Sequence, residues 1–331
     1  MTTKKIVSFI IKFGITIGIF YYLISSGKLN FQKLYVFWEK PIILVVLLVV
    51  FGLIIVPICT VRWWFFLKAL SLNVPLSRSF LLTWIGNFFN TTLPGAVSGD
   101  FVKGYYVIKA NNNEEKTKAF MTLIIDRFTG LFGLIVLAFI TLMFNFHLIF
   151  DQPNLQPLAF SIIGLFLGTV GFYTIVLFPF KDGRDPFIKI INKLPKKEAL
   201  LKIYTTFKVY QNHKKILFWT LFLSTIVQFL VAIAFVIIIQ TLGIEDVNFA
   251  TQMFIMPIGL ITIAIPVAPG GIGVGHVAFD TLYQMVGVSG GADIFNLFVI
   301  IQLSVYLLGG VIYFIYNNEY KLPSADLKKE W

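Results

Sequence analysis

Four ionisable residues stand out because they lie within or beside long apolar stretches: Asp100, Lys103, Asp126 and Arg127. Asp100 and Lys103 are three positions apart and share one face if a helix resumes after Gly99. Asp126 and Arg127 are adjacent, so on a helix they point in different directions and each needs its own partner. A lysine binds phosphate as a mobile point charge, whereas an arginine binds it with two parallel donors. These four residues therefore indicate a site for an anionic group.

The depth of Asp126 makes it a functional candidate. If its helix starts seven residues earlier, Asp126 lies about 10 Å along that helix, and ionisable side chains inside a membrane are functional candidates by default. We expect Arg62 or Lys103 as its partner, and Asp100 or a phosphate as the partner of Arg127. Two simpler interpretations stay open: structural pairing alone, or cations that merely extend to the inner headgroups.

A second polar group occurs later in the chain. His276 and Asp280 are four residues apart, hence on one face of a helix. A histidine that titrates near neutrality beside a carboxylate can relay protons, although a simple hydrogen bond is the alternative. Gln228, Gln284 and Gln302 are expected to line a polar path or to form hydrogen bonds between helices.

The pair Asp100 and Lys103 and the pair His276 and Asp280 lie at glycine-punctuated breaks in apolar sequence, at Thr91–Gly104 and Pro266–Asp280. Unwound backbone at membrane depth is tolerated only where protein or water pairs its polar groups. The breaks therefore predict a buried or water-lined site. Candidate residues at the two breaks are Asn90, Pro94, Gly95 and Gly99, and Pro269, Gly270, Gly271 and Gly273.

The composition predicts an integral membrane protein. Of the 331 residues, 57% are hydrophobic and 13% are charged, against about 25% charged in soluble domains. The net charge of +11 comes from short basic segments between apolar runs, which argues against nucleic-acid binding. Zinc-protease, nucleophile-elbow and phosphate-loop motifs are absent, so we predict no catalytic residue, metal or cofactor. Residues 1–331 are expected to form one transmembrane domain.

Six apolar runs are long enough to cross a hydrocarbon core of about 30 Å. They are Ile6–Ile24, Ile42–Thr60, Ala119–Phe144, Leu158–Phe180, Ile216–Gln240 and Ile294–Tyr316. The first is interpreted as a retained helix, because it is long for a signal peptide and no convincing cleavage site follows it. The fold class is thus all-α, a polytopic membrane helix bundle.

Loop charge predicts the orientation. Basic residues near both ends of the chain indicate cytoplasmic termini. Residues 145–157 contain no Lys or Arg and are expected outside. Lys28, Lys33 and Lys40 contradict this rule, because alternation places their loop outside too.

Two interrupted regions remain. Phe80–Gly104 lies between two basic loops and is expected to enter and leave from the cytoplasm as a re-entrant hairpin. Phe249–Val288 is either a hairpin entered from outside or two full crossings. The hairpin is favoured because Pro257, Pro266 and Pro269 weaken helices there. Two such breaks entered from opposite faces are typical of an inverted repeat.

Residues 181–215 carry ten Lys or Arg against three acidic residues. From Phe187 to Lys215, apolar residues are mixed with lysines, and Pro195 lies near the middle. This pattern predicts two short amphipathic helices on the anionic inner leaflet, with a solvated cytoplasmic loop as the alternative.

Three segments resemble the lysylphosphatidylglycerol synthase/flippase transmembrane family, in the family's order: Arg62–Ala110, Asp126–Ala138 and Pro269–Tyr283. Arg62 fits an Arg-Trp motif, Asp126 and Arg127 fit an acidic-Arg motif, and Lys103 stands where an arginine is usual. His276 occupies a position where other polar residues are common. The Pro-Gly and Gly-Asp motifs are matched by Pro94, Gly95, Gly99, Asp100, Pro269, Gly270, Gly271 and Gly273.

The resemblance implies a lipid transporter. Bifunctional family members move aminoacylated phosphatidylglycerol between leaflets, and related stand-alone members are linked to polyprenyl-phosphate sugar pathways. Because the soluble aminoacyl-transfer domain is not found in this sequence, lipid synthesis is expected from a separate enzyme.

We therefore expect a flippase-like protein of the bacterial cytoplasmic membrane that binds anionic headgroups. A transferase acting on a lipid-linked sugar or phosphate and a non-transporting accessory subunit are the alternatives.

Overall fold

A computed structural model describes residues 25, 31–92, 97–111, 116–178, 180, 185–195, 197–244, 247–264, 271 and 273–316. Every regular element within these residues is a helix. Five helical segments are long and apolar enough to cross a membrane: Pro41–Ala69, Lys116–Phe144, Gln156–Leu177, Phe207–Thr241 and Gly291–Ile315. They confirm the all-α membrane bundle and five of the six predicted spans. The first predicted span, Ile6–Ile24, lies outside the described residues.

The first long span consists of α3 (Pro41–Val49), η2 (Val50–Ile55) and α4 (Val56–Ala69). Its middle part, η2, is a π-helix. Pro57 lies two residues after the end of η2, and a proline removes a backbone donor and displaces the preceding turn. The widened turn lets the span continue through the proline.

Contacts at its two ends show how this span lies against α12 (Lys214–Thr241). Lys40 Nζ donates to the carbonyl of Thr241 at 3.3 Å, and the Tyr210 hydroxyl donates to the carbonyl of Phe66 at 3.2 Å. The two spans are therefore antiparallel. We call the two ends of the bundle the Lys40 end and the Phe66 end.

Two further spans complete this part of the bundle. α7 (Lys116–Phe144) packs against α12, and α9 (Gln156–Leu177) follows it after the short α8 (Phe146–Phe150). Stacked rings join α7 to α9, with Phe139 and Phe166 3.8 Å apart. α9 ends at the Phe66 end, where Gln211 donates to the Leu177 carbonyl at 3.2 Å.

The first interrupted region is a helical hairpin of α5 (Leu76–Thr92) and α6 (Ser98–Ala110). At its base the Asn73 N–H donates to Asn111 Oδ1 at 2.9 Å, and near its tip the Gly99 N–H donates to Asn90 Oδ1 at 2.8 Å. Helices of 17 and 13 residues extend about 25 and 20 Å, less than the core thickness. The predicted hairpin is confirmed, with its base at the Phe66 end and with longer helices than expected.

The second interrupted region is also a hairpin, of α13 (Phe249–Ala264) and α14 (Val274–Gln284). Its base is tied by the Tyr283 hydroxyl, which donates to Gln252 Oε1. Asn154, in the loop before α9, donates to the Met285 carbonyl at 3.1 Å, so this base lies at the Lys40 end. Helices of 16 and 11 residues extend about 24 and 17 Å. The geometry favours the re-entrant hairpin over two crossings.

One expected break is not found, because Pro257 lies inside α13 and the helix continues past it. Pro266 and Pro269 lie outside the described residues. The two hairpins enter from opposite ends of the bundle, as the inverted repeat predicts.

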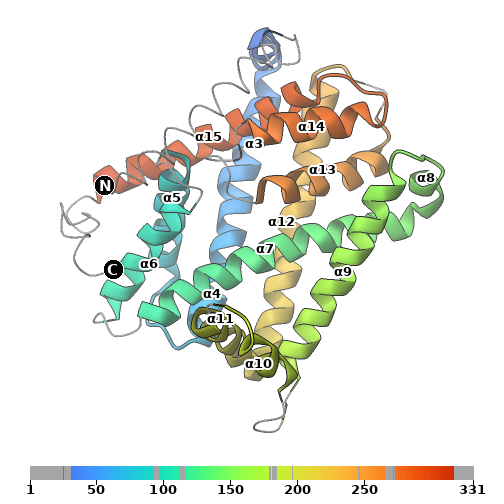
Figure 1. Ribbon diagram of the computed structural model, residues 1–331. Helices are drawn as coiled ribbons and strands as arrows, with labels where there is room; N and C mark the ends of the chain where they lie inside the picture. The colour runs from blue at the N-terminus through green and yellow to red at the C-terminus, as the bar shows by residue number, and fades with distance from the viewer. Residues whose placement is uncertain are drawn as a thin grey trace.

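α15 (Gly291–Ile315) crosses the bundle and packs against both hairpins, as Figure 1 shows. Near its start, a Cβ on Gly291 would overlap the Phe279 carbonyl of α14. Near its end, a Cβ on Gly309 would overlap the Trp84 carbonyl of α5. Glycine therefore allows backbone contact at both ends of this helix.

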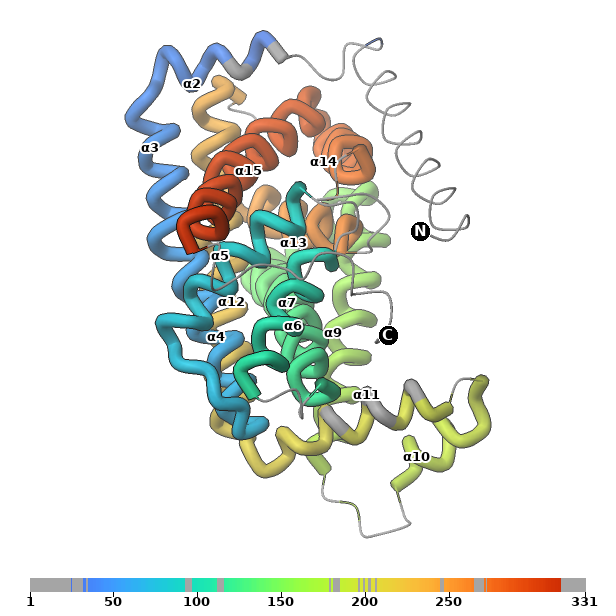
Figure 2. Tube along the Cα trace, turned by 90° about the vertical axis from the view of Figure 1, so that its left-hand side faces the viewer, coloured from blue at the N-terminus to red at the C-terminus, as the bar shows by residue number. Residues whose placement is uncertain are grey.

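The lysines that contradicted the charge rule have internal partners. Lys33, in η1 (Phe31–Tyr35), forms an ion pair of 2.7 Å with Asp293, whose side chain is only 4% exposed. Lys40 bonds to Thr241, as described above, and Lys28 lies outside the described residues. η1 and α2 (Val36–Glu39) run across the top of the bundle in Figure 2. Lys33 and Lys40 thus bind other parts of the bundle, and their charges do not indicate on which side of the membrane the loop lies.

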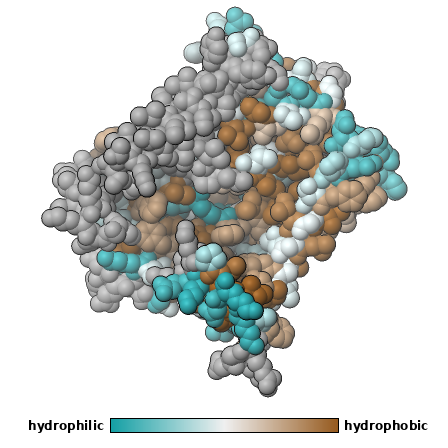
Figure 3. Space-filling model, in the orientation of Figure 1, coloured by the Kyte–Doolittle hydropathy of each residue, from teal (hydrophilic) through white to brown (hydrophobic). Residues whose placement is uncertain are grey.

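At the Phe66 end, α10 (Pro186–Ile191) and α11 (Lys197–Val209) form a small layer that projects beyond the bundle in Figure 2, followed by η3 (Tyr210–His213). They confirm the two predicted short helices. Figure 3 shows polar surface over this layer and over the α8 region at the other end, with a largely apolar band between them. Such a band is the surface that a membrane requires.

Candidate functional site

A buried ion pair joins α4 to α7. Arg62 Nε donates to Asp126 Oδ1 at 2.7 Å and Arg62 Nη2 donates to Asp126 Oδ2 at 3.1 Å. The third nitrogen, Nη1, donates to Ser224 Oγ of α12 at 2.7 Å. The Arg62 side chain is 8% exposed and that of Asp126 is 15% exposed. Two parallel bonds fix the guanidinium firmly, and the expected pairing of Arg62 with Asp126 is confirmed.

Close helix packing places Ser224 within reach of this pair. A Cβ on Gly133 of α7 would lie 2.8 Å from the Cβ of Ser224, so only glycine lets α12 approach this closely. α7 begins at Lys116, which puts Asp126 about 15 Å along the helix, deeper than the 10 Å expected.

The second pair joins α6 to α7 and is more open. Arg127 Nε donates to Asp100 Oδ2. The Arg127 side chain is 42% exposed, whereas that of Asp100 is 16% exposed. The expected pairing of Arg127 with Asp100 is present, and as adjacent residues Asp126 and Arg127 have different partners. Arg127 can therefore be reached by a ligand while Arg62 cannot.

Lys103 is a buried basic residue. Its residue is 7% exposed, and its Nζ lies 4.0 Å from the ring centroid of Trp63. Within the described residues no carboxylate lies within ion-pair distance of it. A Cβ on Gly86 would lie 2.6 Å from the Cδ of Lys103, so Gly86 provides the room that the lysine stem occupies.

By formal charge, the cluster has one more basic than acidic side chain. Arg62, Lys103 and Arg127 supply three cations, and Asp100 and Asp126 supply two carboxylates. An unbalanced cation in a low-dielectric interior attracts an anion strongly. The cluster is therefore suited to a negatively charged group.

A pocket of about 230 Å³ opens beside Asp100 and Arg127. Apart from these two residues its lining is apolar: Val97, Phe101, Phe120, Leu123 and Ile124. Figure 3 shows a polar patch in a hollow near the middle of the visible face, close to where α6 and α7 meet in Figure 1. A charged head beside apolar walls matches the two parts of a lipid.

The region around His276 is a separate unit. Its Nδ1 accepts from the Gly273 N–H at 3.2 Å, and its Nε2 lies 3.5 Å from Asn296 Oδ1 of α15. Asp280 accepts from Gln284 at 2.8 Å. One histidine nitrogen accepts a hydrogen bond and the other faces an acceptor, which is the pattern of a neutral imidazole ring. The ring thereby stabilises the start of α14.

The structure therefore divides the predicted site residues into two groups. Arg62, Asp100, Lys103, Asp126 and Arg127 form one cluster, and Asn90 and Gly99 hold the hairpin beside it. Gly271 and Gly273 belong with His276 and Asp280, and both glycines have positive φ, of 70° and 88°. The residues lining the pocket at Arg127 do not include His276. Pro94, Gly95, Pro269 and Gly270 lie outside the described residues.

Sequence reasoning missed three contributors: Trp63, Gly86 and Ser224. Trp63 directly follows Arg62 and could have been found from that adjacency. Gly86 and Ser224 carry no local signal, because their importance comes only from helix crossings. Gln228 donates to the Gly130 carbonyl of α7 at 3.3 Å, which is the interhelical bond expected of it.

Comparison with known proteins places these features in context. Residues 9–311 match the family described as the lysylphosphatidylglycerol synthase transmembrane region. A UPF0104 membrane protein of Pyrococcus horikoshii is 33% identical over 88 residues, which are 26% of this chain and 26% of that protein. The match thus spans about a quarter of the relative's length. No solved structure matches the chain.

Proposed function

The chain belongs to the lysylphosphatidylglycerol synthase transmembrane family, and on this basis we propose that it is a flippase-like transporter of lipids with anionic headgroups. The observation that supports this most is the accessible Arg127 in an apolar pocket, next to a cluster with one more basic than acidic side chain. The proposed substrates are an anionic or aminoacylated phospholipid, or a polyprenyl-phosphate-linked lipid.

Arg127 is the proposed first contact of the phosphate. Its guanidinium is already held by Asp100, so an incoming phosphate competes with that carboxylate. Lys103 adds a second positive charge from within the bundle. Phe101 and Phe120 line the same pocket and would contact the lipid chain. The Arg62–Asp126 pair is buried and its donors are already hydrogen-bonded, so it does not bind the phosphate. Instead it holds α4, α7 and α12 together.

The two hairpins support translocation. Their bases lie at opposite ends of the bundle, so α5 and α6 enter it from one side and α13 and α14 from the other. In transporters built from inverted repeats, such interrupted helices meet near the bilayer centre and form the substrate path. We propose that the headgroup passes between the two hairpins.

Basic loops predict which end faces the cytoplasm. Lys68, Arg78 and the basic helices α10 and α11 lie at the Phe66 end, and this end is proposed to be cytoplasmic. The proposal includes cytoplasmic termini and residence in a bacterial inner membrane, with a separate enzyme supplying the lipid.

Reconstitution tests the proposal. Liposomes containing the protein would be loaded with fluorescent phosphatidylglycerol, lysylphosphatidylglycerol, a polyprenyl phosphate or phosphatidylcholine, and lipid exchange between leaflets would be followed by quenching from outside. We expect transport of at least one anionic or aminoacylated lipid, and its loss in Arg127→Ala. Arg127→Lys should retain part of it, since charge remains but the two-pronged geometry is lost.

Arg78→Ala is the matched control, because it removes an arginine outside the cluster. Transport that is indifferent to both Arg127→Ala and Asp100→Ala would remove the site proposed here. An absence of transport for every lipid would favour an accessory subunit.

A transferase has less support. A general base must have a lone pair free to take a proton, and the acidic residues are the candidates within this cluster. Asp126 is held by two bonds from Arg62, and Asp100 is held by Arg127. Both acids of the cluster are thus neutralised by arginine.

A further inference from the structure

A second site is indicated by an unsatisfied amide in α13. Gln252 is 1% exposed. Its Oε1 accepts from the Tyr283 hydroxyl, but its Nε2 is buried and finds no partner among the described groups. Buried amide donors are nearly always hydrogen-bonded, so an isolated one in a native protein calls for a partner from outside the chain. Rotating the amide by 180° would only move the deficit to the oxygen.

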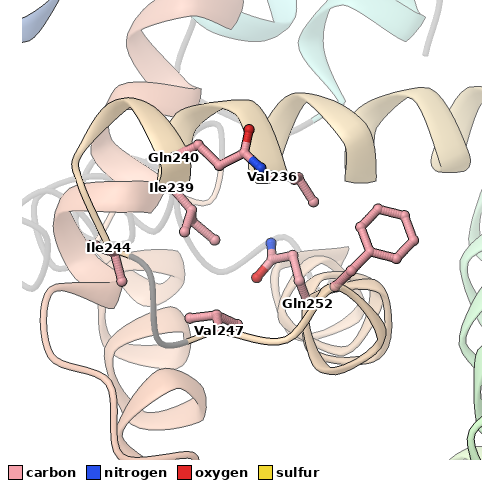
Figure 4. A pocket seen from close by; sticks show the side chains of 7 residues that line it. Val236, Ile239, Gln240, Ile244, Val247 and Gln252 are labelled. Carbon is pink, nitrogen blue, oxygen red and sulfur yellow. The ribbon is translucent and has the colours of Figure 1, made fainter.

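The free donor borders a cavity. Gln252 lines a pocket of about 400 Å³ between the end of α12 and the start of α13. In Figure 4 the nitrogen of Gln252 points into this pocket, and Gln240 extends over it from α12. The other lining residues are Val236, Ile239, Ile244, Val247 and Phe249. The volume lies within the range of small-molecule sites.

None of the seven described residues that line the pocket carries a charge. Moving an ionised group into such a pocket would cost its hydration without a counter-charge in return. Two amides instead offer donors and acceptors to neutral polar atoms. Aliphatic walls and the ring of Phe249 suit the C–H surfaces of a sugar or polyol.

We propose that this pocket binds an uncharged, hydroxyl-bearing group, which accepts a hydrogen bond from Gln252 Nε2 and a second contact from Gln240. Such a group occurs on soluble sugars and on glycosylated lipids alike. The pocket lies at the Lys40 end, because α12 ends there beside Lys40. The pocket is separate from the charged cluster. The proposed binding of a hydroxyl-bearing group therefore does not depend on the proposed lipid transport, and a failure of one proposal leaves the other standing.

Calorimetric titration of the protein in nanodiscs tests this inference. The probes are glucose, octyl β-glucoside below its micellar concentration, and an octyl ether of hexaethylene glycol as the chain-matched control without a sugar. We expect saturable binding of octyl glucoside and none of the ether. Binding of free glucose as well would identify a soluble sugar site, whereas binding of octyl glucoside alone would identify a site for a lipid-anchored sugar.

Three variants link any binding to this pocket. Gln252→Leu should weaken it about fivefold, the value of one neutral hydrogen bond. Val236→Trp should abolish it by filling the pocket while Gln252 keeps its bond to Tyr283. Gln228→Leu removes a glutamine of α12 outside the pocket and should leave binding unchanged. The inference is overturned if neither glucose nor octyl β-glucoside binds, or if binding is unchanged in both Gln252→Leu and Val236→Trp.

Discussion

Arg62 and Asp126, 64 residues apart, meet in two parallel hydrogen bonds that join α4 to α7. The pair fixes the rotation of α7 about its own axis. Because Arg127 follows Asp126 directly, this rotation directs Arg127 away from α4 and toward Asp100 on α6. A structural ion pair thereby positions the neighbouring, accessible arginine.

Breaking this pair should destabilise the protein. Arg62→Met leaves a buried, uncompensated carboxylate, which costs about 3–5 kcal/mol. A large fall in the thermal midpoint of the detergent-solubilised protein would show this. The double variant Arg62→Met, Asp126→Leu should recover most of the loss, because no charge remains buried. If the double variant is as unstable as the single one, the pair is not the source of the stability.

Asp100→Asn should strengthen binding of anionic lipid. The carboxylate competes with phosphate for Arg127, and an exposed or half-exposed ion pair is worth about 0.2–1 kcal/mol, so affinity should rise about 1.4- to fivefold. Native mass spectrometry or fluorescence titration with phosphatidylglycerol would measure this. Weaker binding in Asp100→Asn would mean that the aspartate itself contacts the lipid.

Gly99→Ala should force the two helices of the first hairpin, α5 and α6, apart. An added Cβ would overlap the backbone of Gly86, and overpacking of this kind costs about 1–3 kcal/mol. Gly164→Ala in α9 is the matched control, because no described atom lies within 4 Å of its added Cβ, and helix propensity alone favours alanine there by about 1 kcal/mol. Thermal midpoints should therefore move in opposite directions, and equal effects would contradict the close crossing of α5 and α6.

The docking of α10 on α11 should be insensitive to pH between 5 and 7.5. Burial by itself would raise the pKa of the Asp185 carboxyl, but hydrogen bonds from Lys208 and Tyr204 outweigh this and hold its pKa below the usual value. A lowered pKa in the folded state adds stability above the unfolded value of about 3.9, and that stability is lost as the pH falls through the folded value.

Hydrogen exchange of α10 and α11 at pH 5 and pH 7.5 would check this. Asp185→Asn should expose both helices to exchange at either pH, and Asn192→Ala serves as a nearby surface control. Protection in the wild type that decays already at pH 5 would disprove the assigned role of Asp185.

Cysteine labelling should separate the two ends of the bundle. In a Cys59→Ser background, we expect a cysteine at Asn154 to react with an impermeant maleimide added to intact cells. A cysteine at Asn192 should react only after permeabilisation, because the Phe66 end is proposed to be cytoplasmic. Both positions are exposed in the structure. The reverse pattern would invert the proposed orientation.

The spans and the hairpins could be predicted from the sequence, because each follows from local signals, and the partners of Asp126 and Arg127 could be narrowed to two candidates each. The length of an apolar run predicts a membrane-spanning helix, and the charge of a loop predicts the side of the membrane on which it lies. Asp126 and Arg127 are adjacent on a helix, so they point in different directions and cannot share a partner. Glycines with prolines mark the places where apolar helices stop.

Interactions between distant helices could not be predicted in this way. The i, i+4 spacing of His276 and Asp280 suggested a pair, but each makes a different described contact, His276 with Asn296 of α15 and Asp280 with Gln284. In the sequence, the charge of Lys33 contradicted the predicted orientation of its loop. Its ion-pair partner, Asp293, is 260 positions away and could not be recognised from the sequence. Spacing along one helix says nothing about which other helix covers it.

The glycines of α15 have a mechanical consequence. At Gly291 and at Gly309 this helix contacts the backbone of one hairpin and then of the other, with no side chain between them to absorb a shift. A helix of 25 residues is a stiff rod on this scale. A tilt of one hairpin would therefore displace the backbone of α15 at that contact, and the same rigid helix would press on the other hairpin.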